Sequence, residues 1–155
     1  MRGSRADAKT CALKLLGYRS RSKKEMLERL KRKGFSSEQI NDTIRFLEKS
    51  GLISDESLAS ELLRYSTERK PLGKKGIEAF LARRGIDKEL IGRTLSTHTK
   101  DMEEESARIL LEKKAKSLRN CPEDIAKRRL WGILRRRGFS MDVINRAVKS
   151  VMYSE

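Results

Sequence analysis

One short pattern occurs three times along the chain, and this repetition constrains the fold more than any other feature of the sequence. A basic run that ends in a glycine recurs about fifty residues apart, at residues 31–34, 83–85 and 135–138. Apolar residues stand in register with each glycine, four and eight positions before it and one, six and ten positions after it. The position four before the glycine is always a leucine, namely Leu30, Leu81 and Leu134. This register predicts three copies of one structural unit.

Each copy carries the local signals of two helices joined by a glycine turn. The basic run suits the negative end of a helix dipole, and glycine adopts the left-handed conformation past a helix end without steric strain. Two positions later, Ser36, Asp87 or Ser140 can accept the free N–H groups that begin the next helix. A further helix precedes each pair, over residues 8–16, 55–69 and 101–117, where apolar residues recur at helical spacing.

These signals predict an all-α protein of three tandem three-helix repeats, stacked into an elongated, curved, solenoid-like array. The expected units are residues 1–52, 53–100 and 101–155. No stretch alternates between apolar and polar residues convincingly, so we predict no strands. Two helices joined by a glycine turn also resemble a DNA-reading helix-turn-helix, but three copies at one period favour ordinary helical hairpins within a repeat.

The net charge is +15, with a pI near 10.2, and this points to a polyanionic partner. Nucleic acid is the leading candidate, followed by an acidic protein surface and an anionic membrane. A ribosome-like or simply soluble basic protein is the plainer alternative. The three expected units carry +8, +3 and +4 in chain order, so the first unit is predicted to be the main source of electrostatic attraction.

Motifs for catalysis and cofactor binding are missing from the sequence. There is no glycine-rich phosphate loop, paired-cysteine zinc site or nucleophile motif, and we expect a protein that is not an enzyme and uses no cofactor or metal. His98 lies in a polar stretch and is predicted to be a solvated loop residue. A nuclease with scattered metal-binding carboxylates stays a minor alternative. The few aromatic residues could stack on bases, but core packing is preferred, and Trp131 is expected between units.

Cysteine usage and hydropathy bear on the cellular compartment. Cys11 and Cys121 match no metal or redox spacing, so both are expected to be reduced, with Cys11 a small core residue. No apolar run is long enough for a transmembrane helix, and the first ten residues lack the apolar core of a signal peptide. A cytoplasmic protein that does not bind membranes is therefore expected.

Some cations occupy positions that local helix chemistry does not explain. Ser22 and Glu25 fit a capping box that places Lys23 and Lys24 in the first turn of a helix. Cations there oppose the helix dipole, at a cost of about 0.3–1 kcal/mol each, and features that break a local rule are enriched at functional sites. Screening by solvent, with no functional role, is the alternative. The candidate partner-binding residues are Arg19, Arg21, Lys23, Lys24, Arg69, Lys74, Lys75, Lys127, Arg128, Arg135 and Arg136.

The three units together resemble the RecX family from about residue 8 to residue 152. The resemblance is carried by Arg19-Ser20-Arg21-Ser22 with Glu25-Met26, Leu30 and Gly34-Phe35, by the segment 47–55, by Leu58-Ala59, Arg69, Gly73, Leu81 and Gly85-Ile86, and by residues 134–140. The chain departs from the family pattern at Ser54-Asp55, which lacks one acidic residue, and at Leu58, where phenylalanine is common.

The resemblance implies a regulator of RecA that acts in DNA recombination, repair and the SOS response. Such a protein binds in the groove of the RecA filament on single-stranded DNA and suppresses recombinase and ATPase activity, with weak DNA binding of its own; we expect a monomer. Two competing hypotheses are a sequence-neutral DNA-binding protein that contacts only phosphates and an assembly factor for a larger ribonucleoprotein.

Overall fold

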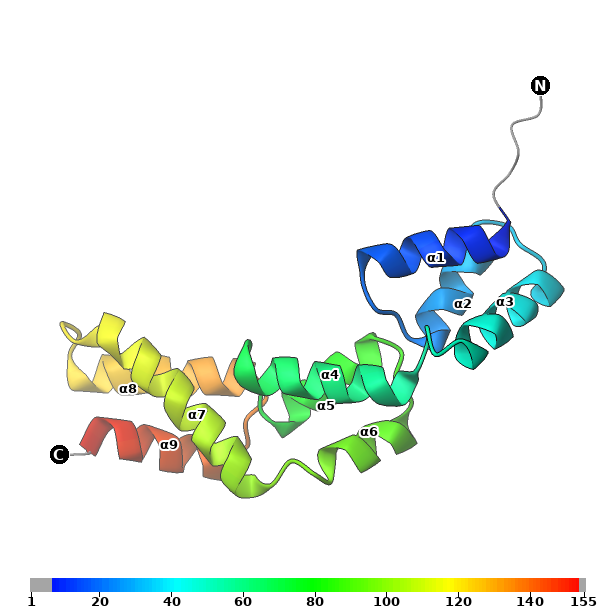
Figure 1. Ribbon diagram of the computed structural model, residues 1–155. Coiled ribbons are helices and arrows are strands. Elements are labelled where there is room, and N and C mark those ends of the chain that lie inside the picture. The colour runs from blue at the N-terminus through cyan, green and yellow to red at the C-terminus, as the bar shows by residue number, and fades with distance from the viewer. Residues whose placement is uncertain (1–6, 154–155) are drawn as a thin grey trace.

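The computed structural model describes residues 7–153, which form nine α-helices, one short 3-10 helix and no strand. The first unit comprises α1 (Ala8–Tyr18), α2 (Lys23–Arg32) and α3 (Ser37–Lys49), and the second comprises α4 (Asp55–Glu68), α5 (Lys74–Arg83) and α6 (Lys88–Leu95). The third comprises α7 (Lys100–Ala115), η1 (Lys116–Leu118), α8 (Glu123–Arg136) and α9 (Met141–Tyr153). The predicted all-α array of three-helix units is confirmed, and Figure 1 shows the units end to end in an elongated molecule. The boundary positions of the three units stay a prediction.

The glycine turn after each second helix has the same geometry in all three units. Gly34, Gly85 and Gly138 have φ values of 89°, 86° and 82°, in the left-handed region. The next residue donates its N–H to the carbonyl of the repeated leucine, over 3.4 Å to Leu30, 3.1 Å to Leu81 and 3.2 Å to Leu134. Ser36, Asp87 and Ser140 then accept N–H groups at the start of the third helices, as predicted.

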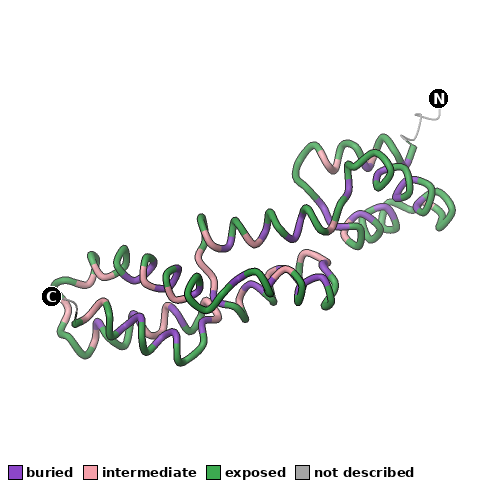
Figure 2. Tube along the Cα trace, turned by 60° about the horizontal axis from the view of Figure 1, so that its bottom comes forward, coloured by how far each residue is buried: buried purple, intermediate pink, exposed green. Residues whose placement is uncertain are grey.

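Each unit has a hydrophobic core of its own. Leu30, Leu81 and Leu134 are completely buried, one in each core, together with Met26, Ile77 and Leu130 one turn earlier. Figure 2 shows that buried segments recur along the helices of each unit between exposed ones. Helices make their main contacts within their own unit, so the three cores do not merge into one as in a typical solenoid.

Truncation of the repeated leucine should destabilise any of the units. Leu30→Ala, Leu81→Ala and Leu134→Ala are each expected to lower the free energy of unfolding by about 2–5 kcal/mol, because each removes a fully buried side chain and leaves a cavity. Urea denaturation followed by circular dichroism measures this change. If all three substitutions left the free energy of unfolding nearly unchanged, the repeated leucine would not be part of the cores.

The elongated shape has a direct solution test. A compact globule of this length has a radius of gyration of about 15 Å. We expect small-angle X-ray scattering to give a clearly larger value, because the units lie in a row and share no core. A value at or below that of the globule would contradict this arrangement.

Candidate functional site

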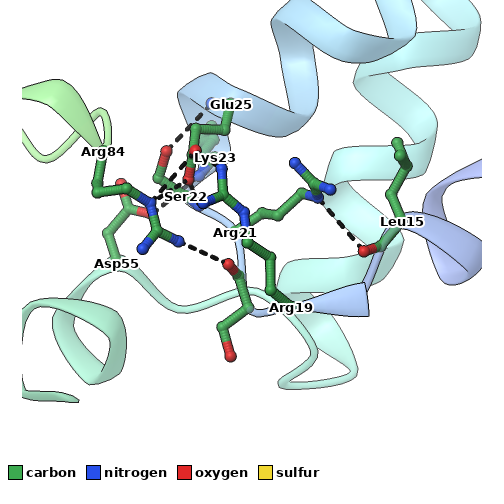
Figure 3. A network of polar contacts seen from close by, with 9 residues as sticks. Leu15, Arg19, Arg21, Ser22, Lys23, Glu25, Asp55 and Arg84 are labelled. Carbon is green, nitrogen blue, oxygen red and sulfur yellow. Dashed lines mark hydrogen bonds and ion pairs between the residues drawn. The ribbon is translucent and has the colours of Figure 1, made fainter. Parts of the chain in front are cut away.

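The first and second units meet where the Arg84–Gly85 turn contacts the start of α2 (Figure 3). Arg84 places its Nε 3.4 Å from the Glu25 carboxylate and donates from Nη2 to the Ser20 carbonyl at 2.8 Å. Glu25 also pairs with Arg19, at 2.9 Å. The Arg84 and Glu25 side chains are largely buried, which reduces solvent screening of their pairing. This junction is therefore polar and specific.

The second and third units meet in the equivalent way, through close backbone contact. The Gly138 turn lies against the start of α5, and Gly73 donates its N–H to the Arg137 carbonyl at 2.9 Å. A Cβ on Gly73, Gly76 or Gly138 would overlap backbone atoms of the other unit. Glycines on both sides thus permit this approach. The Arg137 guanidinium adds a hydrogen bond to the Pro71 carbonyl, at 3.2 Å.

At each junction a carboxylate from the following unit contacts the start of the second helix. Asp55 accepts the Lys23 N–H at 2.9 Å, and Glu103 accepts the Lys74 N–H at 3.1 Å. Both carboxylates lie at the positive end of a helix dipole, which stabilises them there. They supply the negative charge that a helix start favours and that the lysines in these first turns do not provide. Opposition to the dipole is therefore weaker evidence for function than the sequence suggested.

A basic cleft of about 720 Å³ lies at the second junction, between α4 and α5 of one unit and the end of α8 of the next. Its lining contains one carboxylate, Glu61, and an aromatic pair, Tyr65 and Phe80, with ring centroids 6.0 Å apart. Six cations line it: Lys70, Lys75, Arg83, Arg84, Arg136 and Arg137. Repulsion among so many like charges is relieved when an anion enters. We call this feature the basic cleft.

Four of the cleft cations are available to a partner. Lys70, Lys75, Arg83 and Arg136 are exposed, and none forms an ion pair with a carboxylate within residues 7–153. The other two, Arg84 and Arg137, hold the junctions together through the hydrogen bonds described above. The cleft thus combines two arginines engaged at the junctions with four exposed cations.

The structure separates the residues predicted from sequence into three groups. Lys75 and Arg136 line the basic cleft, and Arg69 and Lys74 are exposed neighbours of cleft residues in the chain. Arg19, Arg21 and Lys23 lie at the first junction (Figure 3), and Lys24 lies there beside Gly85. Lys127, Arg128 and Arg135 are exposed on α8. The roles of all these residues in binding stay a prediction.

Sequence reasoning missed Lys70, Arg83, Arg84 and Arg137 as cleft residues. The three arginines belong to the basic runs before glycine, which a structural role at a helix end already explained. The repeated basic runs are visible in the sequence, but only the fold shows that two of them lie at the turns that join the units. A cation of such a run can thus serve both a helix end and a surface shared between units.

Arg21, one of the candidate partner-binding residues, is buried instead of lying free at the surface. Only 7% of the residue is exposed, and its Nε donates to the Leu15 carbonyl at the end of α1, over 3.3 Å. Burial, followed by the charges of Arg19 and Arg29, lowers the pKa of the guanidinium. Arg21→Glu is therefore expected to destabilise the first unit, since the variant would bury a carboxylate beside a carbonyl oxygen.

His98 is also placed differently from the prediction. It is 7% exposed, not solvated, and neither ring nitrogen has a hydrogen-bond partner within the described residues. It follows α6 and precedes Glu103, which anchors the second junction. Burial lowers the pKa of the imidazole, with the Glu103 carboxylate acting in the opposite direction and the Lys74 ammonium in the same one. The neutral ring is therefore the form that the fold accommodates.

A pH dependence of stability follows from this burial. The unfolded chain takes up a proton at His98 below about pH 6.5, while the folded chain resists it. Stability is thus full above that pH and should fall as the pH drops from 7.5 to 5.5. Urea denaturation at these two pH values is informative because His98 is the only histidine.

His98→Leu should remove most of that pH dependence. It should also raise the free energy of unfolding by about 1–3 kcal/mol, since two buried nitrogens without partners disappear. An unchanged difference between the two pH values in this variant would contradict the assignment.

Trp131 and Cys11 pack within units. Trp131 is partly buried against the core of the third unit, between α8 and α9, so its expected place between units is wrong. Cys11 is only partly buried against the core of the first unit. Within residues 7–153, no group of three or more histidines, cysteines and carboxylates is placed to hold a metal ion. None of the helices described there is long and apolar enough to span a membrane.

Comparison with known proteins identifies the family. The model of the first three-helix domain of RecX matches residues 8–47, and that of the third matches residues 102–148. Regulatory protein RecX of Pelodictyon phaeoclathratiforme is 37% identical, over 92% of this chain and 87% of the relative. The RecX protein of Chlorobium limicola is 33% identical, over 94% and 89% respectively.

Solved structures agree with the sequence comparisons. The crystal structure of RecX from Lactobacillus salivarius superposes with a TM-score of 0.78 at 25% identity, over 93% of this chain and 94% of that one. A second crystal structure of a regulatory protein RecX shares the fold, with a TM-score of 0.77 at 23% identity, over 95% and 81% of the two chains. With two of the three domains matched and relatives that align along nearly the whole length, this chain belongs to the RecX family of regulatory proteins.

Proposed function

We propose that this protein is a negative regulator of RecA, which binds the RecA filament on single-stranded DNA and inhibits its recombinase and ATPase activities. Family membership supports a regulatory role, since the relatives are named regulatory proteins. The observation that carries the proposal is the basic cleft, where four cations that pair with no carboxylate among residues 7–153 face a shared space beside an aromatic pair.

In this proposal the protein acts by occupancy and not by catalysis. An elongated row of three units can contact several neighbouring subunits of a filament, whereas a compact protein of equal mass would reach fewer. The cleft cations meet phosphates of the enclosed strand or carboxylates of the filament surface. A bound protein then obstructs subunit addition or strand exchange. No metal or cofactor is needed for this mode of action.

The alternative is a sequence-neutral DNA-binding protein that acts without RecA. The exposed cations favour it as well, because phosphate contacts carry most of the affinity in non-specific DNA binding. The two functions differ in what the protein binds best. A regulator binds the RecA–DNA filament more tightly than naked DNA at the same salt concentration.

One experiment separates these functions. The full chain is titrated into RecA on single-stranded DNA while ATP hydrolysis is followed, and its affinity is measured for the filament and for the DNA alone. The proposal expects saturable loss of ATP hydrolysis and preference for the filament. If the protein bound naked DNA as tightly as the filament and left ATP hydrolysis unchanged, the regulator proposal would be wrong and the sequence-neutral DNA-binding protein would be the better description.

A further inference from the structure

A second pocket lies on the third unit, between α8 and α9, and the basic cleft does not include it. Its volume is about 370 Å³, and its lining consists of Lys127, Trp131, Asn145, Val148, Lys149 and Tyr153. Two aromatic rings, two ammonium groups and a side-chain amide thus share a small space without any acidic residue. We call it the aromatic pocket.

Each ring in the aromatic pocket has a cation over its face. The Arg135 guanidinium lies 5.4 Å from the Trp131 ring centroid, and the Lys127 ammonium lies 6.0 Å from that of Tyr153. Both cations are exposed and form no ion pair within residues 7–153. A flat ligand can therefore replace either cation at the ring, and the displaced cation can bind an anion attached to that ligand.

Helix geometry supports Trp131 and holds it in place. Residues 127, 131 and 135 recur every four positions on α8, and residues 145, 149 and 153 do so on α9, so the two rows flank one groove. Trp131 packs against the third core through part of its surface, which orders the ring before any ligand binds. Tyr153 is 55% exposed at the open side.

We propose that the aromatic pocket binds bases of single-stranded DNA by stacking on Trp131 and Tyr153. A flat group linked to phosphates matches two rings flanked by cations, and stacking of bases on aromatic side chains is typical of single-strand binding. A duplex is a poorer ligand, because its bases already stack on one another. The amide of Asn145 adds hydrogen-bonding capacity for a base edge.

The aromatic pocket and the basic cleft are linked along the chain. Arg135 lies over the Trp131 ring beside the pocket, while Arg136 and Arg137, the next two residues of the chain, line the cleft. In this proposal a bound strand extends over the end of α8 from one site to the other. The inference deepens the proposed function by naming how the DNA strand is held, but its test does not involve RecA.

The test uses the full chain and a labelled oligo-dT, compared with an abasic oligomer of equal length. Because Trp131 is the only tryptophan, its fluorescence reports this pocket alone. We expect saturable quenching by oligo-dT and little by the abasic oligomer or by a duplex. Equal quenching by the abasic oligomer would overturn base stacking and leave only phosphate contacts.

Several variants are used, so that the test still gives an answer if one of them folds poorly. Trp131→Leu and Tyr153→Leu should each weaken oligo-dT binding by roughly 5- to 100-fold, as expected for the loss of one stacked base. Trp131→Phe should retain most of the affinity. Tyr18→Leu is the matched control, since Tyr18 is an exposed tyrosine on α1 of the first unit, outside the aromatic pocket.

The outcomes separate this inference from the proposed function. If folded Tyr153→Leu and Trp131→Phe/Tyr153→Leu variants bound oligo-dT as tightly as the parent protein, the proposal that bases stack in the pocket would be wrong, even if the parent protein inhibits RecA. The same is true if an acidic peptide competes better than oligo-dT for the pocket. Stacking without any effect on RecA would support the pocket and overturn the regulator.

Discussion

Replacement of Lys70 and Lys75 by glutamate is expected to raise the protein concentration needed for half-inhibition of RecA-dependent ATP hydrolysis by about a hundredfold, in about 50 mM monovalent salt. For single strands the logarithm of a binding constant falls by about 0.7 per phosphate contact for each decade of salt, so one contact contributes roughly tenfold between about 1 M and 50 mM salt. Both lysines line the basic cleft without carboxylate partners in the described residues.

The fold should tolerate this double change. Lys75 lies in the first turn of α5, where a carboxylate is favoured by the helix dipole, and Lys70 is exposed between α4 and α5. Circular dichroism and urea denaturation should therefore match the parent protein. The remaining inhibition should also depend less on salt, because fewer counterions are released on binding.

Two further double variants show whether location matters or only net charge. Lys88→Glu with Lys113→Glu changes the charge equally outside the cleft and should retain nearly full inhibition. Lys23→Glu with Lys24→Glu tests the candidates at the first junction, where Lys23 is already held by Glu48 at 3.0 Å; we expect an intermediate loss. Equal losses in all three variants would show that the cleft has no special role.

Local chemistry explains why the helices could be predicted from the sequence. The caps at Ser22, Ser36 and Asp87 and the left-handed turn at Gly34 depend on residues within five positions of each other. The repeated leucine was predictable for the same reason, because helical spacing within one unit determines which side chains face inward.

Contacts between units could not be derived in that way. The carboxylates of Asp55 and Glu103 reach N–H groups 32 and 29 residues earlier in the chain, and the basic cleft joins residues 61–84 to residues 136–138. Periodicity does not say which turn meets which helix start. The burial of His98 could not be predicted for the same reason. Its polar neighbours in the sequence suggested exposure to solvent, whereas the fold buries it.

Net charge per unit was similarly incomplete as a guide to the site. The first unit carries the largest charge, yet several of its cations are engaged, for instance Arg19 with Glu25 and Arg21 with a carbonyl. The basic cleft instead lies between units with smaller totals. The arrangement of cations relative to carboxylates determines local potential, and only the folded chain provides it.

Alanine at Gly138 is expected to disrupt the second junction, whereas alanine at Gly34 should affect only its own turn. The two glycines have nearly the same left-handed φ, so each substitution carries a backbone cost of about 1–2 kcal/mol. A Cβ at Gly34 meets no other atom within 4 Å, while one at Gly138 would overlap the backbone of Gly76. The difference between the variants therefore isolates the junction.

The extra loss for Gly138→Ala should be about 1–3 kcal/mol in urea denaturation, as for overpacking at a close contact. Gly85→Ala should lie between the other two, because its Cβ would meet the Ser22 hydroxyl, a side-chain atom that can move at the cost of the α2 cap. Inhibition of RecA should follow the same order, since Gly138 lines the basic cleft and Gly34 does not. Equal losses of stability and of inhibition in Gly138→Ala and Gly34→Ala would show that close packing at the second junction does not position the cleft. Loss of inhibition in Gly138→Ala alone, with the core of each unit still folded, would show that one added methyl group disturbs the cleft through the junction and not through a core.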